Sequence, residues 1–185
     1  IYLHGKNLTV SAATLSAGET LIAAEYAQVD PSGVARLSLP ISVSAGQARL
    51  TIDYGAPFST TLDGLYKVEE DDRAYAFTQF EAISARMAFP SFDEPRFKAP
   101  FSISLTVPEG YEAISNSVEI SREPTQTGMQ RIRFKRTRPL PTYLLSLAVG
   151  PFDRVDAPSL APNAVRSVAV PVKGYTRRDK GDEIA

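Results

Sequence analysis

The chain has 185 residues, of which 43% are hydrophobic and 22% charged, and its 20 basic and 21 acidic residues give a formal net charge of −1. This length and composition are typical of one globular domain. Because the basic and acidic residues nearly balance, strong attraction to nucleic acid or anionic lipid is disfavoured. The sequence contains no cysteine, which excludes disulfides and thiolate metal sites.

The first part of the chain predicts β-strands joined by tight turns. Leu21–Val29 and Val34–Leu39 flank Asp30–Gly33, a segment whose Pro and Gly supply the backbone geometry of a turn between paired strands. In Ala48–Tyr54 apolar side chains alternate with polar ones, which is the pattern of a strand with one buried face. We therefore expect a hairpin followed by a third strand.

A second hairpin and a single helical turn follow. Leu65–Val68 and Tyr75–Phe80 bracket the charged turn Glu69–Arg73, so these two segments are expected to pair. Ala82–Met87 is rich in helix formers and Pro90 ends it, which makes this segment the one plausible helical turn of the chain.

The remaining apolar segments predict further short strands. Phe101–Val107 alternates apolar and polar side chains, and strands are also expected at Tyr111–Ile114, Arg131–Lys135 and Thr142–Val149. Ala, Pro and Ser dominate Asp156–Pro162, which predicts a loop. Strands spaced by turns in this way favour an all-β fold, an antiparallel β-sandwich or barrel, over a βαβ sheet.

Two local features could suggest nucleic-acid or membrane binding. The basic run from Arg131 to Arg138 alternates with Ile132 and Phe134, so it is interpreted as the solvated face of a strand, and it lacks the aromatic platforms of single-stranded nucleic-acid sites. The longest apolar run, Tyr143–Val149, is far shorter than the roughly 20 residues of a membrane span. We expect neither nucleic acid nor a membrane span, and the cellular compartment stays open.

The segment from Thr78 to Pro95 reads TQFEAISARMAFPSFDEP. It resembles the signature segment in the N-terminal domain of the zinc aminopeptidases, the aminopeptidase N family. Further segments fit the same domain in the same order, namely Leu62–Tyr66, Phe97–Phe101, Ala113–Asn116, Thr142–Leu145 and Val149–Phe152. The resemblance implies a saddle-like β-sandwich over residues 1–175 that lacks the family's first strands, with 176–185 as a charged linker toward a catalytic domain absent from this chain.

The resemblance also implies the substrate-binding residues. At the position of Glu81 the family carries an acidic or amide residue that binds the free α-ammonium group of a peptide, and Gln79 matches a residue that commonly contributes beside it. A carboxylate facing an ammonium forms a charge-assisted hydrogen bond worth ~1.5–3 kcal/mol. Without the resemblance, a Glu that opens a short helix is more often a surface residue favoured by the helix dipole.

No catalytic residue is predicted in this chain. The family's zinc site needs His-Glu-x-x-His on a helix and a further Glu, whereas His4 is the only histidine here. No metal site is therefore expected, and the resemblance implies that zinc in the full-length enzyme is bound by the absent catalytic domain. His4 is interpreted as a structural histidine. Ser91 has no general base nearby in the sequence, which disfavours a serine hydrolase.

Asp93 and Glu94 are adjacent carboxylates between Pro90 and Pro95. Neighbouring side chains on an extended or turn segment diverge, so the two do not form a facing catalytic pair. We expect instead that one of them holds the loop through a hydrogen bond, with Arg86 as its partner.

The resemblance thus implies the N-terminal substrate-recognition domain of a zinc-dependent aminopeptidase that removes amino-terminal residues from peptides. The expected partners are a peptide with a free N-terminus and the chain's own catalytic domain in cis, and the fragment alone is expected to be inactive. Two alternatives stay open: a stand-alone β-sandwich binding module and an inactive relative of the aminopeptidases.

Overall fold

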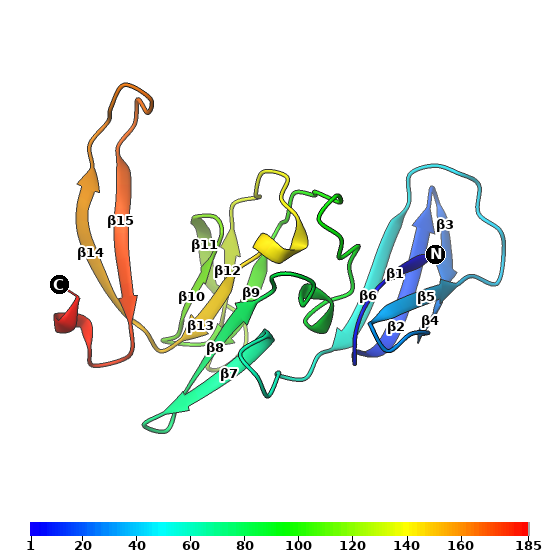
Figure 1. Ribbon diagram of the computed structural model, residues 1–185, viewed down its shortest axis with the longest axis horizontal. Coiled ribbons are helices and arrows are strands. Elements are labelled where there is room, and N and C mark those ends of the chain that lie inside the picture. The colour runs from blue at the N-terminus through cyan, green and yellow to red at the C-terminus, as the bar shows by residue number, and fades with distance from the viewer. Residues whose placement is uncertain (185) are drawn as a thin grey trace.

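The computed structural model describes residues 1–184, and short antiparallel strands dominate their fold (Figure 1). In chain order the strands are β1 (Tyr2–His4), β2 (Thr9–Ala17), β3 (Thr20–Ala23), β4 (Glu25–Gln28), β5 (Val34–Ser38), β6 (Arg49–Gly55), β7 (Gly64–Glu70), β8 (Arg73–Gln79), β9 (Ser104–Pro108), β10 (Glu112–Ser115), β11 (Glu119–Pro124), β12 (Met129–Phe134), β13 (Leu147–Gly150), β14 (Asp153–Leu160) and β15 (Val170–Thr176). Short 3-10 turns are η1 (Ala85–Met87), η2 (Thr142–Leu144) and η3 (Gly181–Glu183). The prediction of an all-β, antiparallel, sandwich-like fold is confirmed.

The N-terminal part is a small sandwich of two three-stranded sheets, β1-β5-β4 and β3-β2-β6. Alternation along β5 buries Ala35 and Leu37, and these side chains pack with Leu3 of β1 and Ala13 of β2 to form the core between the sheets. The single strand expected over 21–29 is in fact two strands in different sheets, because the chain passes from one sheet to the other at Ala24.

The central part contains the four-stranded sheet β10-β13-β8-β7 and the three-stranded sheet β11-β12-β9. Their facing sides contribute Val107, Ala113, Ile132 and Phe134 to one core cluster. The outward positions of β12 are exposed and basic, as the alternation of that segment predicted.

The second predicted hairpin is confirmed, since β7 and β8 pair from Gly64–Gln79 to Glu70–Arg73. Asp71 and Asp72 form its turn with φ of 50° and 58°. Positive φ at both central residues is what a two-residue type I′ turn requires. Strand β8 of this hairpin runs to the end of the sheet at which the signature segment, Thr78–Pro95, begins.

Two predicted elements are wrong in type. Thr142–Val149 begins as the 3-10 turn η2, in which Leu145 N donates to Thr142 O over 3.0 Å, and only its second half forms strand β13. Asp156–Pro162, expected as a loop, lies largely in β14, which pairs with β15. A register shift between Ala157 and Leu160 brackets Pro158, which has no N–H to donate to the ladder.

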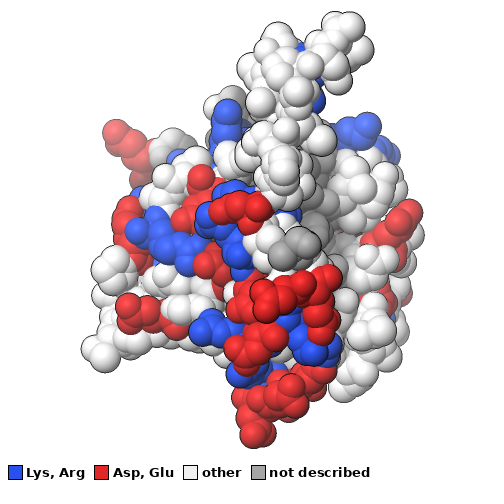
Figure 2. Space-filling model, turned by 90° about the vertical axis from the view of Figure 1, so that its left-hand side faces the viewer, with Lys and Arg blue, Asp and Glu red and all other residues white. Residues whose placement is uncertain are grey.

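The β14–β15 hairpin projects from the central part (Figure 1). Figure 2 shows side chains of both charge signs interspersed below this projection, whose tip is almost free of charge. The C-terminal segment returns to the central sheet, where Asp179 Oδ2 lies 2.7 Å from Arg73 Nη2 and Arg178 N donates to the Tyr75 hydroxyl. Among residues 1–184, no helix has the length and apolar character to cross a membrane.

Candidate functional site

The candidate site is built where β8 ends. Phe80 follows the last strand residue and is 1% exposed, packed with Ala85 and Leu145 and edge-on to Phe89 at 5.8 Å between ring centroids. The residues on either side of it, Gln79 and Glu81, are both exposed. One buried aromatic ring therefore fixes the backbone between the two residues that the family resemblance implies as substrate-binding.

The Glu81 carboxylate is not engaged by the protein. Among residues 1–184, neither a hydrogen bond nor an ion pair involves this carboxylate, although the molecule pairs many of its other acidic groups. The peptide bond between Glu81 and Ala82 is cis. An exposed carboxylate on a fixed backbone, with all of its acceptor capacity free, can bind a cation or a hydrogen-bond donor from a ligand.

The turn after Glu81 is closed by short backbone hydrogen bonds. Ser84 N donates to Phe80 O over 2.9 Å, and η1 follows directly; it is shorter than the helical turn expected over 82–87. Met87 packs on Gly64, opposite Gln79 in the β7–β8 ladder, where φ is +74° and an added Cβ would lie 3.2 Å from Met87 Cβ. Glycine at position 64 is therefore required for this close approach.

The end of β10 and the start of β13 lie at the same end of the sheet as the end of β8. Leu147 N donates to Thr78 Oγ1 over 2.8 Å, next to Gln79. The Asn116 side chain, directly after β10, accepts from Ser146 N and donates to Leu144 O, both over 2.8 Å. These contacts hold the loop after η2 beside the end of β8.

Exposed apolar side chains accompany Glu81 at this edge. Ile83 is 52% exposed and Leu144 is 51% exposed. Ile83 lies two residues after Glu81, so apolar surface is exposed on the same turn as the free carboxylate.

A buried ion pair holds the loop that follows. Asp93 is 1% exposed, and its Oδ2 accepts from Arg86 Nε over 2.9 Å and from Arg86 N over 3.2 Å. Its Oδ1 accepts from the Thr142 hydroxyl over 2.5 Å, and Arg86 also donates to Ser32 O. The expected partnership of Arg86 is confirmed for Asp93, whereas Glu94 pairs with Arg96 at the surface.

His4 takes part in the same junction. Its Nδ1 accepts from Asp93 N over 3.2 Å, and its backbone exchanges two hydrogen bonds with Ser91, of 2.7 and 2.9 Å. Burial first, and then the Arg86 charge, lower the pKa of His4 below its ordinary 6.5. The fold therefore brings His4 opposite Ser91, but the buried Ser91 Oγ has no hydrogen-bond partner within residues 1–184, so the pair is not an activated serine.

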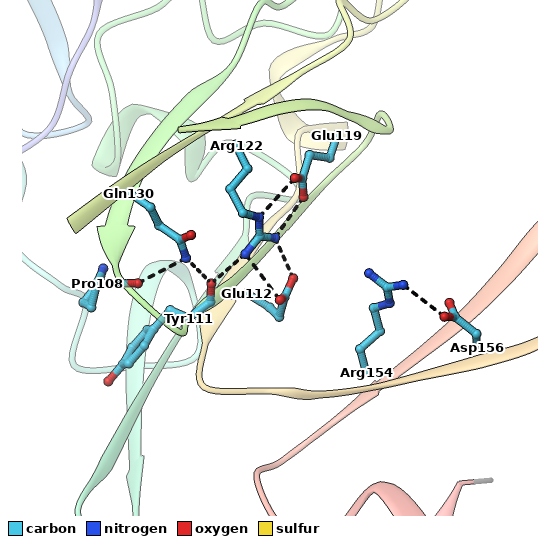
Figure 3. Close-up of polar contacts among 8 residues, drawn as sticks. All are labelled: Pro108, Tyr111, Glu112, Glu119, Arg122, Gln130, Arg154 and Asp156. Atoms are coloured by element: carbon cyan, nitrogen blue, oxygen red, sulfur yellow. Dashed lines mark hydrogen bonds and ion pairs between the residues drawn. The ribbon is translucent and has the colours of Figure 1, made fainter. Parts of the chain in front are cut away.

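A second polar cluster was not foreseen from the sequence. Arg122 Nη2 lies 2.8 Å from Glu112 Oε2 and 2.9 Å from Glu119 Oε2, in a cleft of about 650 Å³ between β10, β11 and the β14–β15 hairpin (Figure 3). Hydrogen bonding to Glu119 raises the pKa of Arg122, and the same contact lowers the pKa of Glu119. Because two carboxylates compensate this guanidinium, the cluster offers a ligand no free positive charge. No spacing in the sequence marks Arg122 and Glu112 as partners.

Comparison with known proteins agrees with the resemblance in the signature segment. A family model described as the peptidase M1 N-terminal domain matches residues 1–144. Aminopeptidase N of Acetobacter pasteurianus is 34% identical over 81% of this chain and 43% of its own length. Endoplasmic reticulum aminopeptidase 1 of Mus musculus is 34% identical, covering 94% of this chain and 20% of its own length. The puromycin-sensitive aminopeptidase of Caenorhabditis elegans is 28% identical, covering 92% of this chain and 19% of its own length. The chain thus spans less than half the length of each of these relatives.

Proposed function

The chain belongs to the peptidase M1 N-terminal domain family, and from this premise we propose that it is the substrate-recognition part of a longer zinc-dependent aminopeptidase. Glu81 is the residue that binds the amino terminus of the peptide. The observation that carries the proposal is the exposed and unengaged Glu81 carboxylate, which the buried Phe80 fixes at the end of strand β8.

The carboxylate selects peptide ends by charge. A free α-ammonium donates charge-assisted hydrogen bonds to Glu81, whereas the interior of a peptide offers only a neutral amide at that place. Gln79, two residues away and also exposed, contributes its side-chain oxygen as a second acceptor. Holding the amine in this way orients the first peptide bond, which is the kind of positioning that lowers the barrier of a bound reactant.

The residues of this chain do not fit a zinc site. Among residues 1–184 there is no group of three or more His, Cys, Asp or Glu side chains placed to hold a metal ion, and the Nδ1 of His4 is occupied by Asp93 N. We propose that zinc and the catalytic residues belong to a catalytic domain in the same polypeptide. No bond-making step is assigned to residues 1–185.

Kinetics of the full-length protein test the role of Glu81. Glu81→Gln should raise KM, lower kcat and reduce kcat/KM for free-amine substrates on the order of 10- to 100-fold, because the ammonium keeps a hydrogen-bond acceptor but loses the carboxylate charge that attracts it. Glu109→Gln removes another exposed carboxylate, from the turn after β9, and should leave the kinetics unchanged. Wild-type kinetics in the Glu81→Gln protein would remove Glu81 from the site.

A further inference from the structure

The loop before β13 is bound by one side chain on both sides of a buried leucine. The Asn116 amide nitrogen donates to Leu144 O, and its Oδ1 accepts from Ser146 N, both over 2.8 Å. Leu145, the residue between these two backbone groups, is buried. A single side-chain amide thus uses both a donor and an acceptor to fix the backbone that carries Leu145.

Leu145 connects this loop to the candidate site. It belongs to the same core cluster as Phe80, which is the residue directly before Glu81. Phe80 is almost completely buried, and in a close-packed interior the position of a side chain depends on the side chains that enclose it. A loop that holds Leu145 in place therefore also holds Phe80, and the backbone of Glu81 with it.

The order of the strands explains how a residue after β10 acts at the end of β8. Strand β13 lies between β10 and β8 in the central sheet (Figure 1). The loop that leads into β13 therefore lies between the end of β8 and Asn116, which directly follows β10. Contacts through this one loop are sufficient to join the two strand ends.

The loop has two further anchors, at its start and at its end. The Thr142 hydroxyl donates to the buried Asp93 carboxylate, and Leu147 N donates to Thr78 Oγ1 over 2.8 Å. Asn116 supplies the anchor between them, and its side chain is exposed. It can therefore be replaced without opening a cavity in the core, so its effect on the site can be measured in a folded protein.

We propose that Asn116 is a positioning residue of the amine site. It fixes the Glu81 carboxylate indirectly, through the contact between Leu145 and Phe80, and does not itself touch the peptide. The inference rests on the proposed function, in which this carboxylate binds the α-ammonium group. If Phe80 is held less firmly, the carboxylate has more positions to adopt, and fixing it on the substrate costs additional conformational entropy.

Steady-state kinetics of the full-length protein measure this role. Asn116→Ala removes both hydrogen bonds to the loop and should lower kcat/KM for free-amine substrates by about 3- to 10-fold, chiefly by raising KM. The matched control lies in the β14–β15 hairpin, where Asn163 Oδ1 accepts from Val165 N and Arg166 N. Asn163→Ala removes a comparable pair of exposed hydrogen bonds and should leave the kinetics unchanged.

A double-mutant cycle shows whether Asn116 acts through Glu81. In the Glu81→Gln protein, Asn116→Ala should cause less than about a twofold further loss, because most of the interaction that it supports is already gone. The same full loss in both backgrounds would overturn the proposal. Wild-type kinetics of Asn116→Ala would also overturn it, provided that Glu81→Gln is impaired.

Hydrogen exchange measured by mass spectrometry separates the failure of this inference from the failure of the proposed function. Ser84 N donates to Phe80 O, so its exchange reports on the turn that carries Glu81. In full-length Asn116→Ala this amide should exchange at least about fivefold faster than in the wild type, and in Asn163→Ala it should not. Unchanged exchange in Asn116→Ala would overturn the positioning role even where Glu81 governs KM. Faster exchange together with wild-type kinetics of Glu81→Gln would instead overturn the proposed function, and with it the role of Asn116 at the amine site.

Discussion

Arg86 Nε lies 2.9 Å from Asp93 Oδ2, and both side chains are less than a tenth exposed. This pair joins η1 to the loop that precedes Pro95, and through Ser32 and Thr142 it joins both to the N-terminal sandwich and to η2. The junction thus sits where three parts of the fold meet.

Replacing Asp93 by Ala should lower the free energy of unfolding by about 3–5 kcal/mol, because it leaves the Arg86 guanidinium buried without its partner. Glu94→Ala is the matched control, since the exposed pair between Glu94 and Arg96 is worth only about 0–1 kcal/mol. Thermal or urea unfolding measures both. We expect the affinity for a free-amine ligand to stay at the wild-type value in Asp93→Ala, and a loss of affinity without a loss of stability would contradict the structural role.

His4 gives this junction a pH dependence. Burial and Arg86 lower its pKa below 6.5, although Asp93 and Glu94 act in the opposite direction. The unfolded chain therefore binds the His4 proton more readily than the folded chain does, so this contribution to stability is complete above about pH 6.5 and is lost as the pH falls toward the folded pKa.

We expect the urea midpoint to decrease from pH 7 to pH 5, and we expect His4→Asn, which keeps an acceptor for Asp93 N, to make this decrease smaller. The comparison needs urea titrations of both proteins at the two pH values. An identical decrease in the two proteins would assign the pH dependence to other groups.

The strand pattern of the sequence was sufficient to predict the class of fold. Alternation in Ala48–Tyr54 and the acidic turn of the second hairpin are local signals, and both lead to the observed strands β6, β7 and β8. The errors arose where distant contacts decide the structure. Thr142 turns into η2 while its hydroxyl binds Asp93, 49 residues away, and β14 forms because β15 is present to pair with it.

The candidate site was accessible to sequence reasoning only in part. Glu81 and Gln79 came from resemblance, since nothing in their immediate sequence distinguishes them from surface residues. The partnership of Arg86 with Asp93 could be anticipated, because Pro90 and Pro95 flank the loop that carries Asp93 and restrict its backbone. The exposed Leu144 could not, because it comes from a separate segment that Asn116 holds beside the end of β8.

The β7–β8 turn offers a stabilising substitution. Asp72 adopts φ of 58°, which costs a residue with a Cβ roughly 1–2 kcal/mol relative to glycine. Asp72→Gly should therefore raise the free energy of unfolding. Asp72→Ala removes the same charge but keeps the Cβ, so the difference between the two variants in urea unfolding isolates the backbone effect. Equal stabilities would show that the turn relaxes to another geometry.

Gln79 provides the finest test of how the amine is held. In the full-length protein Gln79→Ala should reduce kcat/KM for free-amine substrates by about 3- to 10-fold, which is less than the effect of Glu81→Gln, because the Gln79 amide oxygen carries no net charge and attracts the ammonium less strongly than the Glu81 carboxylate does. Since both side chains are proposed to bind one ammonium group, their effects should be coupled, and the double variant should lose less than the sum of the two single losses. Strict additivity would mean that Gln79 and Glu81 act on different parts of the substrate, and a larger loss from Gln79→Ala than from Glu81→Gln would reverse the assigned roles.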